Sequence, residues 1–247
     1  MINISYTMKK IMFNDRFGLT DDVLAGRKTM TRRLVKLPSG IAVKDVYGPV
    51  MGIDGSGKVY FTFDCTDGSR FDVYPYYQVG EKVAVSQCYK QVYRSFSRAG
   101  TRHEYGLRIA AVHHSGDLDN IPGWTNKMFV KANLMPHRIR ITDVKVERLC
   151  DITDKDCERE GVIPVTWRQW LRQDWDDMSP QKYRDHDVWT LPKFRDGILD
   201  SWSEGDPDEY MAETAQVAYA VLIFKLMGKK VWYGNPWVFA YSFECIK

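Results

Sequence analysis

The strand-like segments of this chain lie far apart in the sequence, and helical segments do not alternate with them. Alternating apolar residues or short apolar runs predict strands in "GEKVAVSQCYK" (80–90), "MPHRIRITDVKVERL" (135–149) and "NPWVFAYSFECI" (235–246). Capping residues and periodicity predict helices over 20–26, 153–161 and 209–226. Such spacing favours an α+β fold built on a small mixed β-barrel over regular βαβ units.

Each predicted helix carries its own signals for where it begins and ends. Thr20 is expected to cap the first helix, which Gly26 then ends in a left-handed conformation. Thr153 is expected to cap the second helix, and Gly161 to end it after barely two turns. An amphipathic pattern over 209–226 predicts the third helix, which is also the longest.

Three segments do not fit the core pattern, and we expect them to be insertions in a single domain that spans 1–247. The insertions are a β-rich segment at about 39–78, a long polar and basic loop at 94–126, and a tryptophan-rich, acidic and irregular segment at 164–207. The first contains "GIDGSGK" (52–58), which matches the GxxxxGK pattern of phosphate-binding loops. Because Val59 and a strand-like run follow instead of Ser or Thr and a helix, we predict a hairpin turn there.

The composition is that of a folded soluble protein, with 44% hydrophobic and 27% charged residues. The longest apolar run, "VAYAVLIF" (217–224), is far shorter than the roughly 18 to 20 residues that a membrane span needs. The first residues lack the pattern of a secretory signal. The five cysteines form no CxxC pair, and the five histidines show no zinc-ligand spacing. We therefore expect a cytoplasmic protein with reduced cysteines, no metal, no cofactor and no membrane partner.

The charges are unevenly distributed although the net charge is only +3. Lys and Arg are concentrated in 27–36, 90–108 and 127–140, whereas Asp and Glu dominate 151–160, 174–187 and 196–213. One interpretation is two solvated faces of opposite sign. The other is a basic face that binds phosphates and includes Arg138 and Arg140.

The densest cationic cluster follows the first predicted helix, in "VLAGRKTMTRRL" (23–34). After Gly26, it contains the candidate binding residues Arg27, Lys28, Thr31, Arg32 and Arg33. The cluster is either a solvated turn whose cations pair with acids, or a pocket for a polar or anionic ligand. Sequence alone leaves both interpretations open.

The segment "MKKIMFNDRFGLTDDVLAGRKTMTRR" resembles the opening of ASCH-domain proteins, which share the PUA-like β-barrel. The GxKxxTxR signature of that family corresponds here to Gly26, Lys28, Thr31 and Arg33. The later segments "GEKVAV", "RIRITDVKVERLCDITDKDCEREGV" and "NPWVFAYSFECI" follow in the family's order. The style of "GRKTMTRR" and "NPWVF" is similar to versions carried by phages and mobile elements. The resemblance implies a PUA-like mixed β-barrel with short flanking helices and inserted segments.

The resemblance also implies three functions, between which the sequence does not decide. The first is recognition of a nucleic acid, RNA above all, or of a modified nucleoside. The second is hydrolysis: one bacterial branch deacylates acetylated cytidine with a Lys, a Thr and a Glu, which correspond to Lys28, Thr31 and Glu160, and some members are reported as ribonucleases. In that case Lys28 activates Thr31, and Glu160 either orients the lysine or shuttles the proton. The third is a scaffold whose 164–207 segment binds a protein partner.

Overall fold

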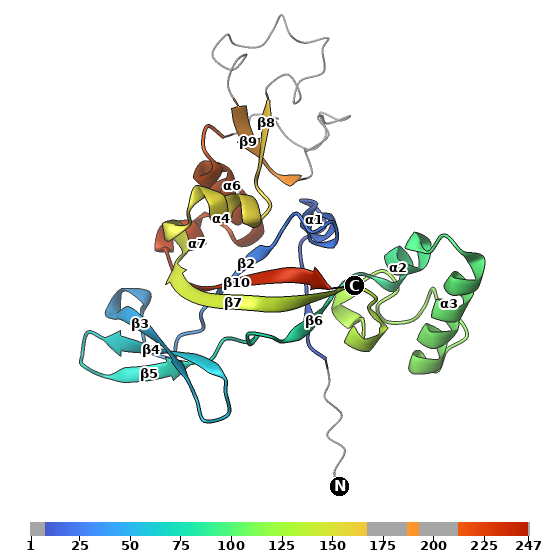
Figure 1. Cartoon of the computed structure of the whole chain (residues 1–247), viewed down its shortest axis with the longest axis horizontal. Coiled ribbons are helices and arrows are strands. Elements are labelled where there is room, and N and C mark those ends of the chain that lie inside the picture. Colours follow the sequence, from blue (N-terminus) through green and yellow to red (C-terminus); the bar gives the residue numbers. More distant parts are fainter. Residues whose placement is uncertain (1–7, 167–186, 193–211, 247) are drawn as a thin grey trace, which may run out of the picture. The chain divides into compact units, whose positions relative to one another are not determined.

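The computed structural model describes residues 8–166, 187–192 and 212–246, and these form two compact units (Figure 1). The first unit comprises Met1–Asn14, Gly80–Arg140 and Glu244–Lys247, and the second comprises Asp15–Val79 and Ile141–Phe243. The strands β7 (Arg138–Arg148) and β10 (Trp237–Ile246) contribute residues to both units. A single domain over 1–247 stays a prediction.

In the second unit, β10 lies between β7 and β2 (Met30–Leu34). The pairing of β10 with β2 is antiparallel, and Tyr241 lies opposite Thr31. A second, three-stranded antiparallel sheet consists of β3 (Val46–Ile53), β4 (Val59–Cys65) and β5 (Arg70–Val73). This sheet confirms the predicted β-rich character of 39–78.

The turn between β3 and β4 is the predicted hairpin turn and not a phosphate-binding loop. The Asp54 Oδ1 atom accepts hydrogen bonds from the backbone N–H groups of Ser56 (2.8 Å) and Lys58 (3.0 Å). An Asp side chain that bonds the backbone two residues on is a common way to stabilise a tight turn. No helix follows Lys58, because β4 begins at Val59.

The aromatic residues of the predicted strand β10 form part of the core of the second unit. Phe239, Tyr241 and Phe243 are buried and alternate along the strand. Their partners come from the 39–78 region: the ring of Phe61 lies 5.9 Å from that of Phe239, and the ring of Tyr77 lies 5.4 Å from that of Tyr241.

The helix α1 (Leu19–Leu24) has its N-cap two residues before the predicted cap at Thr20. Gly18 is its N-cap residue, with a φ of 70°, and the Gly18 carbonyl accepts from the Asp22 N–H. The predicted cap at Thr20 is therefore wrong: Thr20 lies in the first turn and its hydroxyl donates to Asp15. Gly26 has a φ of +72° after the helix, so its left-handed conformation is confirmed.

The helix α4 (Asp154–Arg159) is bounded as predicted. The Thr153 hydroxyl accepts from the Asp156 N–H at 3.2 Å, and Gly161, with a φ of +105°, follows the helix. These two signals fix the position of the C-cap residue, Glu160.

The helix α6 (Ala215–Met227) is shorter than the predicted 209–226. Thr214 caps it, because its hydroxyl accepts from the Val217 N–H, and Ala212 pairs with Trp189 in a β-bridge. Residues 209–211 lie outside the described residues. The helix packs beside α4, and α7 (Lys229–Gly234) follows it (Figure 1).

The predicted irregular segment 164–207 lies mostly outside the described residues. Its described part contributes to a two-stranded sheet of β8 (Ile163–Thr166) and β9 (Asp187–Thr190). Short 3₁₀ turns complete the second unit at Val43–Asp45 and Leu149–Asp151.

The first unit combines a small sheet with two helices. The strand β1 (Lys10–Ile11) runs parallel to β6 (Lys82–Val85), which pairs antiparallel with the first residues of β7. The helices are α2 (Tyr89–Ser95) and α3 (Ala99–His113), and 3₁₀ turns follow at Lys127–Phe129 and Ala132–Leu134. The prediction of a loop over 94–126 is therefore wrong.

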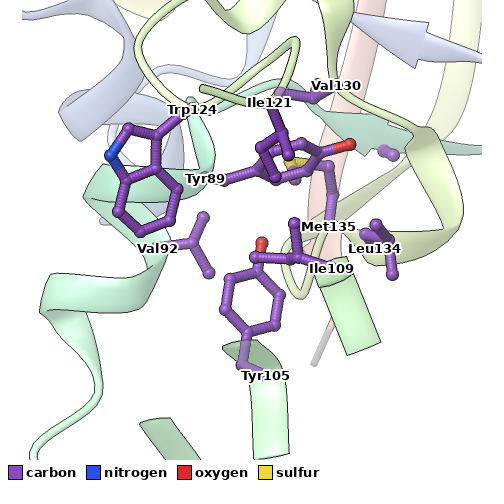
Figure 2. Close-up of a cluster of buried hydrophobic side chains, with 10 residues drawn as sticks. Tyr89, Val92, Tyr105, Ile109, Ile121, Trp124, Val130, Leu134 and Met135 are labelled. Atoms are coloured by element: carbon purple, nitrogen blue, oxygen red, sulfur yellow. The ribbon is translucent and has the colours of Figure 1, made fainter. Parts of the chain in front are cut away.

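The sequence analysis did not predict the helix α3, because the apolar face of this helix is short. Only Tyr105, Gly106 and Ile109 of its fifteen residues are buried. Figure 2 shows how this face meets α2 and the following turns in one cluster. The cluster consists of Ala84, Tyr89, Val92, Tyr105, Ile109, Ile121, Trp124, Val130, Leu134 and Met135. Packing against these residues stabilises a helix whose own sequence signal is weak.

The mixed α+β class is confirmed, whereas a closed barrel is not found among the described strands, which form open sheets. No helix within the described ranges is long and apolar enough to cross a membrane. Cys65, Cys88, Cys150 and Cys157 are free thiols.

Candidate functional site

Two of the three candidate catalytic residues meet inside the second unit. Lys28 follows α1, and only 2% of its surface is exposed. Its Nζ atom lies 2.6 Å from the Glu160 Oε2 atom and 2.5 Å from the Glu160 carbonyl oxygen. Glu160 is itself only 4% exposed, since the end of α4 and Gly161 hold it against Lys28. The structure thus pairs a buried ammonium group with a buried carboxylate.

Arg32 is the second cation on the same carboxylate. Its Nη1 atom lies 3.1 Å from Glu160 Oε1, and its Nη2 atom lies 3.2 Å from Asp156 Oδ2. Its Nε atom donates to Glu147 Oε1 at 2.8 Å, and its guanidinium carbon lies 5.9 Å from the centre of the Tyr219 ring. A buried guanidinium requires such partners, and Arg32 finds them on β7, α4 and the residue that ends α4.

Two further cations complete this ion network at its edge. Lys145 Nζ lies 2.8 Å from Asp156 Oδ2 and 2.9 Å from Glu147 Oε2. Arg159 Nη1 lies 3.1 Å from Asp156 Oδ1, and its Nη2 atom donates to Ser242 Oγ at 2.7 Å. We call this set the ion network: Lys28, Arg32, Glu147, Lys145, Asp156, Arg159 and Glu160.

Sequence reasoning missed the roles of several members of the ion network. Lys145 and Glu147 are two residues apart on β7, so they lie on one face of the strand and could have been grouped. The backbone N–H of Asp156 donates to the capping residue Thr153, while its carboxylate binds three cations. No local pattern points to Tyr219.

The surroundings shift the pKa of several groups in and beside the network, among them Lys28, Tyr219 and Asp156. Burial lowers the pKa of Lys28, although Glu160 opposes the change, and the nearby charges of Arg33 and Arg32 lower it further. Burial raises the pKa of Tyr219 well above its usual value, and Glu160 adds to this effect. Burial opposes ionisation of Asp156, but the hydrogen bond and charge of Lys145 outweigh it and hold that pKa below normal. Lys28 therefore gives up its proton more readily than an exposed lysine.

Thr31, the third candidate catalytic residue, lies on β2 and is buried. Side chains alternate along a strand, so Thr31 and Arg33 share the face opposite to Arg32. Across the strand pair, Thr31 lies beside Tyr241 of the aromatic core. Within the described ranges, no hydrogen bond joins the Thr31 hydroxyl to Lys28 or Glu160.

The other candidate binding residues lie apart from the Lys28–Glu160 pair. Gly26 forms the turn before Lys28, and Arg27, with a side chain 46% exposed, donates from Nε to Asp22 Oδ1 at 2.7 Å. Arg138 and Arg140 belong to the first unit, where Arg140 Nη1 lies 3.3 Å from Glu244 Oε1. The structure therefore divides the predicted binding residues between two units.

A pocket of about 380 Å³ lies on the outer side of α4 in the second unit. Three cations, two acids and three consecutive apolar residues line it. They are Asp22, Arg27, Lys155, Glu158, Arg159, Val162, Ile163 and Pro164. Of these, only Arg27 was among the predicted site residues.

The positive charge of the chain is concentrated in the first unit. Its sequence segments hold 13 Lys and Arg against five Asp and Glu, a net charge of +8, whereas the whole chain carries +3. Arg94, Arg98 and Arg108 are exposed, and none of them forms an ion pair with a described residue. Their charge is therefore not neutralised by neighbouring carboxylates in the described part of the unit.

Comparison of the chain with protein-family models, curated proteins and solved structures finds no match in any of the three. The part of the chain that the structure describes contains no group of three or more His, Cys, Asp or Glu side chains arranged to hold a metal ion.

Proposed function

We propose that this protein recognises nucleic acid, RNA above all, and that the first unit supplies the phosphate-binding surface. The net charge of +8 on the first unit is the observation that carries the proposal. Unpaired Lys and Arg side chains displace counterions from a phosphate backbone, and this release provides most of the sequence-independent affinity. The resemblance to ASCH domains supports the same function. The proposal therefore includes a PUA-like β-barrel as the core of the fold.

The proposal predicts RNA binding that weakens steeply with salt. Arg94→Gln combined with Arg98→Gln removes two exposed cations that have no ion-pair partner among the described residues. We expect the slope of log K against log salt to fall by about 1.4, because each lost phosphate contact on a single strand contributes about 0.7. Fluorescence polarisation with a labelled single-stranded RNA, at KCl concentrations from about 50 to about 300 mM, measures the slope.

The matched control for this experiment is Lys58→Gln, an exposed cation in the β3–β4 turn of the second unit. It removes a positive charge from the chain and leaves the first unit intact. A loss of slope of about 0.7 in Lys58→Gln, half of that expected for the double variant, would mean that only the total charge matters. An unchanged slope in the double variant would contradict the proposed surface.

A second candidate function is hydrolysis of an acylated base, and the buried Lys28–Glu160 pair favours it. A lysine with a lowered pKa next to a carboxylate is an arrangement suited to proton transfer. In this candidate the neutral form of Lys28, which its lowered pKa favours, takes the proton of the attacking hydroxyl, and Glu160 orients the ammonium group that results. Thr31 serves as the nucleophile only if its hydroxyl reaches Lys28 from the face of β2 opposite to Arg32.

The hydrolase candidate predicts release of cytidine from acetylated cytidine, measured by chromatography. Lys28→Arg should reduce the rate by about 100-fold or more, because a guanidinium keeps the positive charge but cannot accept a proton. Far-ultraviolet circular dichroism checks that the variant is folded. Absence of turnover by folded wild-type protein, or full turnover by Lys28→Arg, would remove this candidate.

A further inference from the structure

The pocket on the outer side of α4 combines cations with an apolar wall. Arg27, Lys155 and Arg159 contribute positive charge, and Val162, Ile163 and Pro164 follow one another along the lining. A volume of about 380 Å³ falls within the range of roughly 300 to 1,000 Å³ that small-molecule sites occupy. The pocket therefore suits a compact ligand with an anionic end and an apolar face.

The two arginines are held in place and still have donors to offer. An arginine carries five N–H donors. Arg27 directs its Nε and Nη2 groups to Asp22, a buried carboxylate, at 2.7 and 2.5 Å. Arg159 donates one hydrogen each from Nε, Nη1 and Nη2, to Thr29, Asp156 and Ser242. Several N–H groups of the pair remain for a ligand, and the fixed guanidinium groups lose little freedom when they bind it.

Lys155 is the third cation, and it is exposed. It forms no ion pair or hydrogen bond with a described residue, so no described residue occupies its three donors. The two acidic residues that line the pocket differ in how much of its positive charge they offset. Asp22 is neutralised by Arg27, whereas Glu158 is exposed at the rim and has no such partner among the described residues.

We propose that this pocket binds a nucleoside monophosphate, with the phosphate on Lys155, Arg27 and Arg159 and the nucleoside against Pro164, the exposed residue of the apolar wall. A phosphate monoester carries nearly two negative charges and matches several cationic donors at once. Val162 and Ile163 are buried behind the lining, so the exposed ring of Pro164 provides the apolar contact for the nucleoside. Every lining residue belongs to the second unit, so this proposal does not rest on RNA binding by the first unit.

Isothermal titration calorimetry of the full chain with cytidine or adenosine monophosphate tests the proposal, beside the parent nucleosides and inorganic phosphate. We expect saturable binding of a monophosphate that is at least about tenfold tighter than binding of its nucleoside or of inorganic phosphate. No detectable binding of either monophosphate would overturn the proposal. Equal binding of inorganic phosphate would also overturn it, since the apolar wall would then contribute nothing.

Two variants of opposite charge locate the site. Lys155→Ala should weaken monophosphate binding about tenfold, while Glu158→Gln, which removes the carboxylate at the rim, should leave it equal or tighter. Both side chains are exposed, so folding should be preserved. Lys44→Ala, an exposed cation outside the pocket, is the control and should bind as the wild type does. An unchanged affinity in Lys155→Ala, or weaker binding in Glu158→Gln, would place the ligand elsewhere.

Discussion

Glu160→Ala should destabilise the protein by about 3–5 kcal/mol, which is the usual cost of removing one partner from a buried ion pair. The Glu160 carboxylate binds the Lys28 ammonium group at 2.6 Å and the Arg32 guanidinium at 3.1 Å. Without it, two buried cations lose a shared counter-charge that solvent cannot replace, because less than a tenth of either cation's surface is exposed. Urea denaturation followed by circular dichroism measures the loss.

Glu158→Gln is the matched control for this experiment, since it removes an exposed carboxylate from the same helix. We expect it to change the free energy of unfolding by no more than about 0.5 kcal/mol. Lys28→Met combined with Glu160→Gln should cost less than the sum of the two single changes, because the double variant removes both charges of the pair. Additive costs would mean that Lys28 and Glu160 do not interact in solution.

Gly123→Ala should destabilise the first unit by about 3 kcal/mol. Gly123 has a φ of +95°, which a side chain disfavours, and a Cβ there would lie 2.7 Å from Cε2 of Tyr89. Tyr89 is fully buried in the cluster of Figure 2, so its ring cannot move aside without displacing its neighbours. Its hydroxyl also accepts from the Lys131 N–H at 2.7 Å. Urea denaturation followed by tryptophan fluorescence measures the effect.

Gly116→Ala is the control for Gly123→Ala within the same unit. No atom lies within 4 Å of the position that its Cβ would take, and its φ is not positive. We expect the free energy of unfolding to change by less than about 0.5 kcal/mol. If both alanine variants unfold at the same urea concentration, the contact between Gly123 and the Tyr89 ring does not determine the stability of the unit.

The features that could be predicted from the sequence depend on neighbouring residues. Thr153 and Gly161 bound α4 because a cap and a left-handed glycine act within one or two turns. The aromatic alternation of β10 and the turn at Asp54 are local in the same sense. The predicted cap at Thr20 was wrong because Gly18 caps α1 through its backbone conformation. A glycine has no side chain that would indicate a cap in the sequence.

The features that could not be predicted depend on pairing across the chain. Lys28 and Glu160 were proposed as partners only because a family resemblance related them, and nothing local indicates that Arg32 shares the same carboxylate. The helix α3 depends on contacts with residues up to Met135, so its own sequence looks like a polar loop. In elements such as α3, tertiary packing outweighs the local helix propensity of the sequence.

The position of the first unit in the sequence has a consequence for synthesis. Lys28 and Glu160 are separated by 132 residues, and the segment Gly80–Arg140 lies between them. During translation Lys28 and Arg32 leave the ribosome long before Glu147, Asp156 and Glu160 exist, so the amino-terminal part of the second unit has no counter-charges to bury. The segment Gly80–Arg140 is complete before the ion network can form. A nascent chain that stops short of residue 160 therefore holds an unfinished second unit, and the last carboxylate of the network arrives only when α4 is complete.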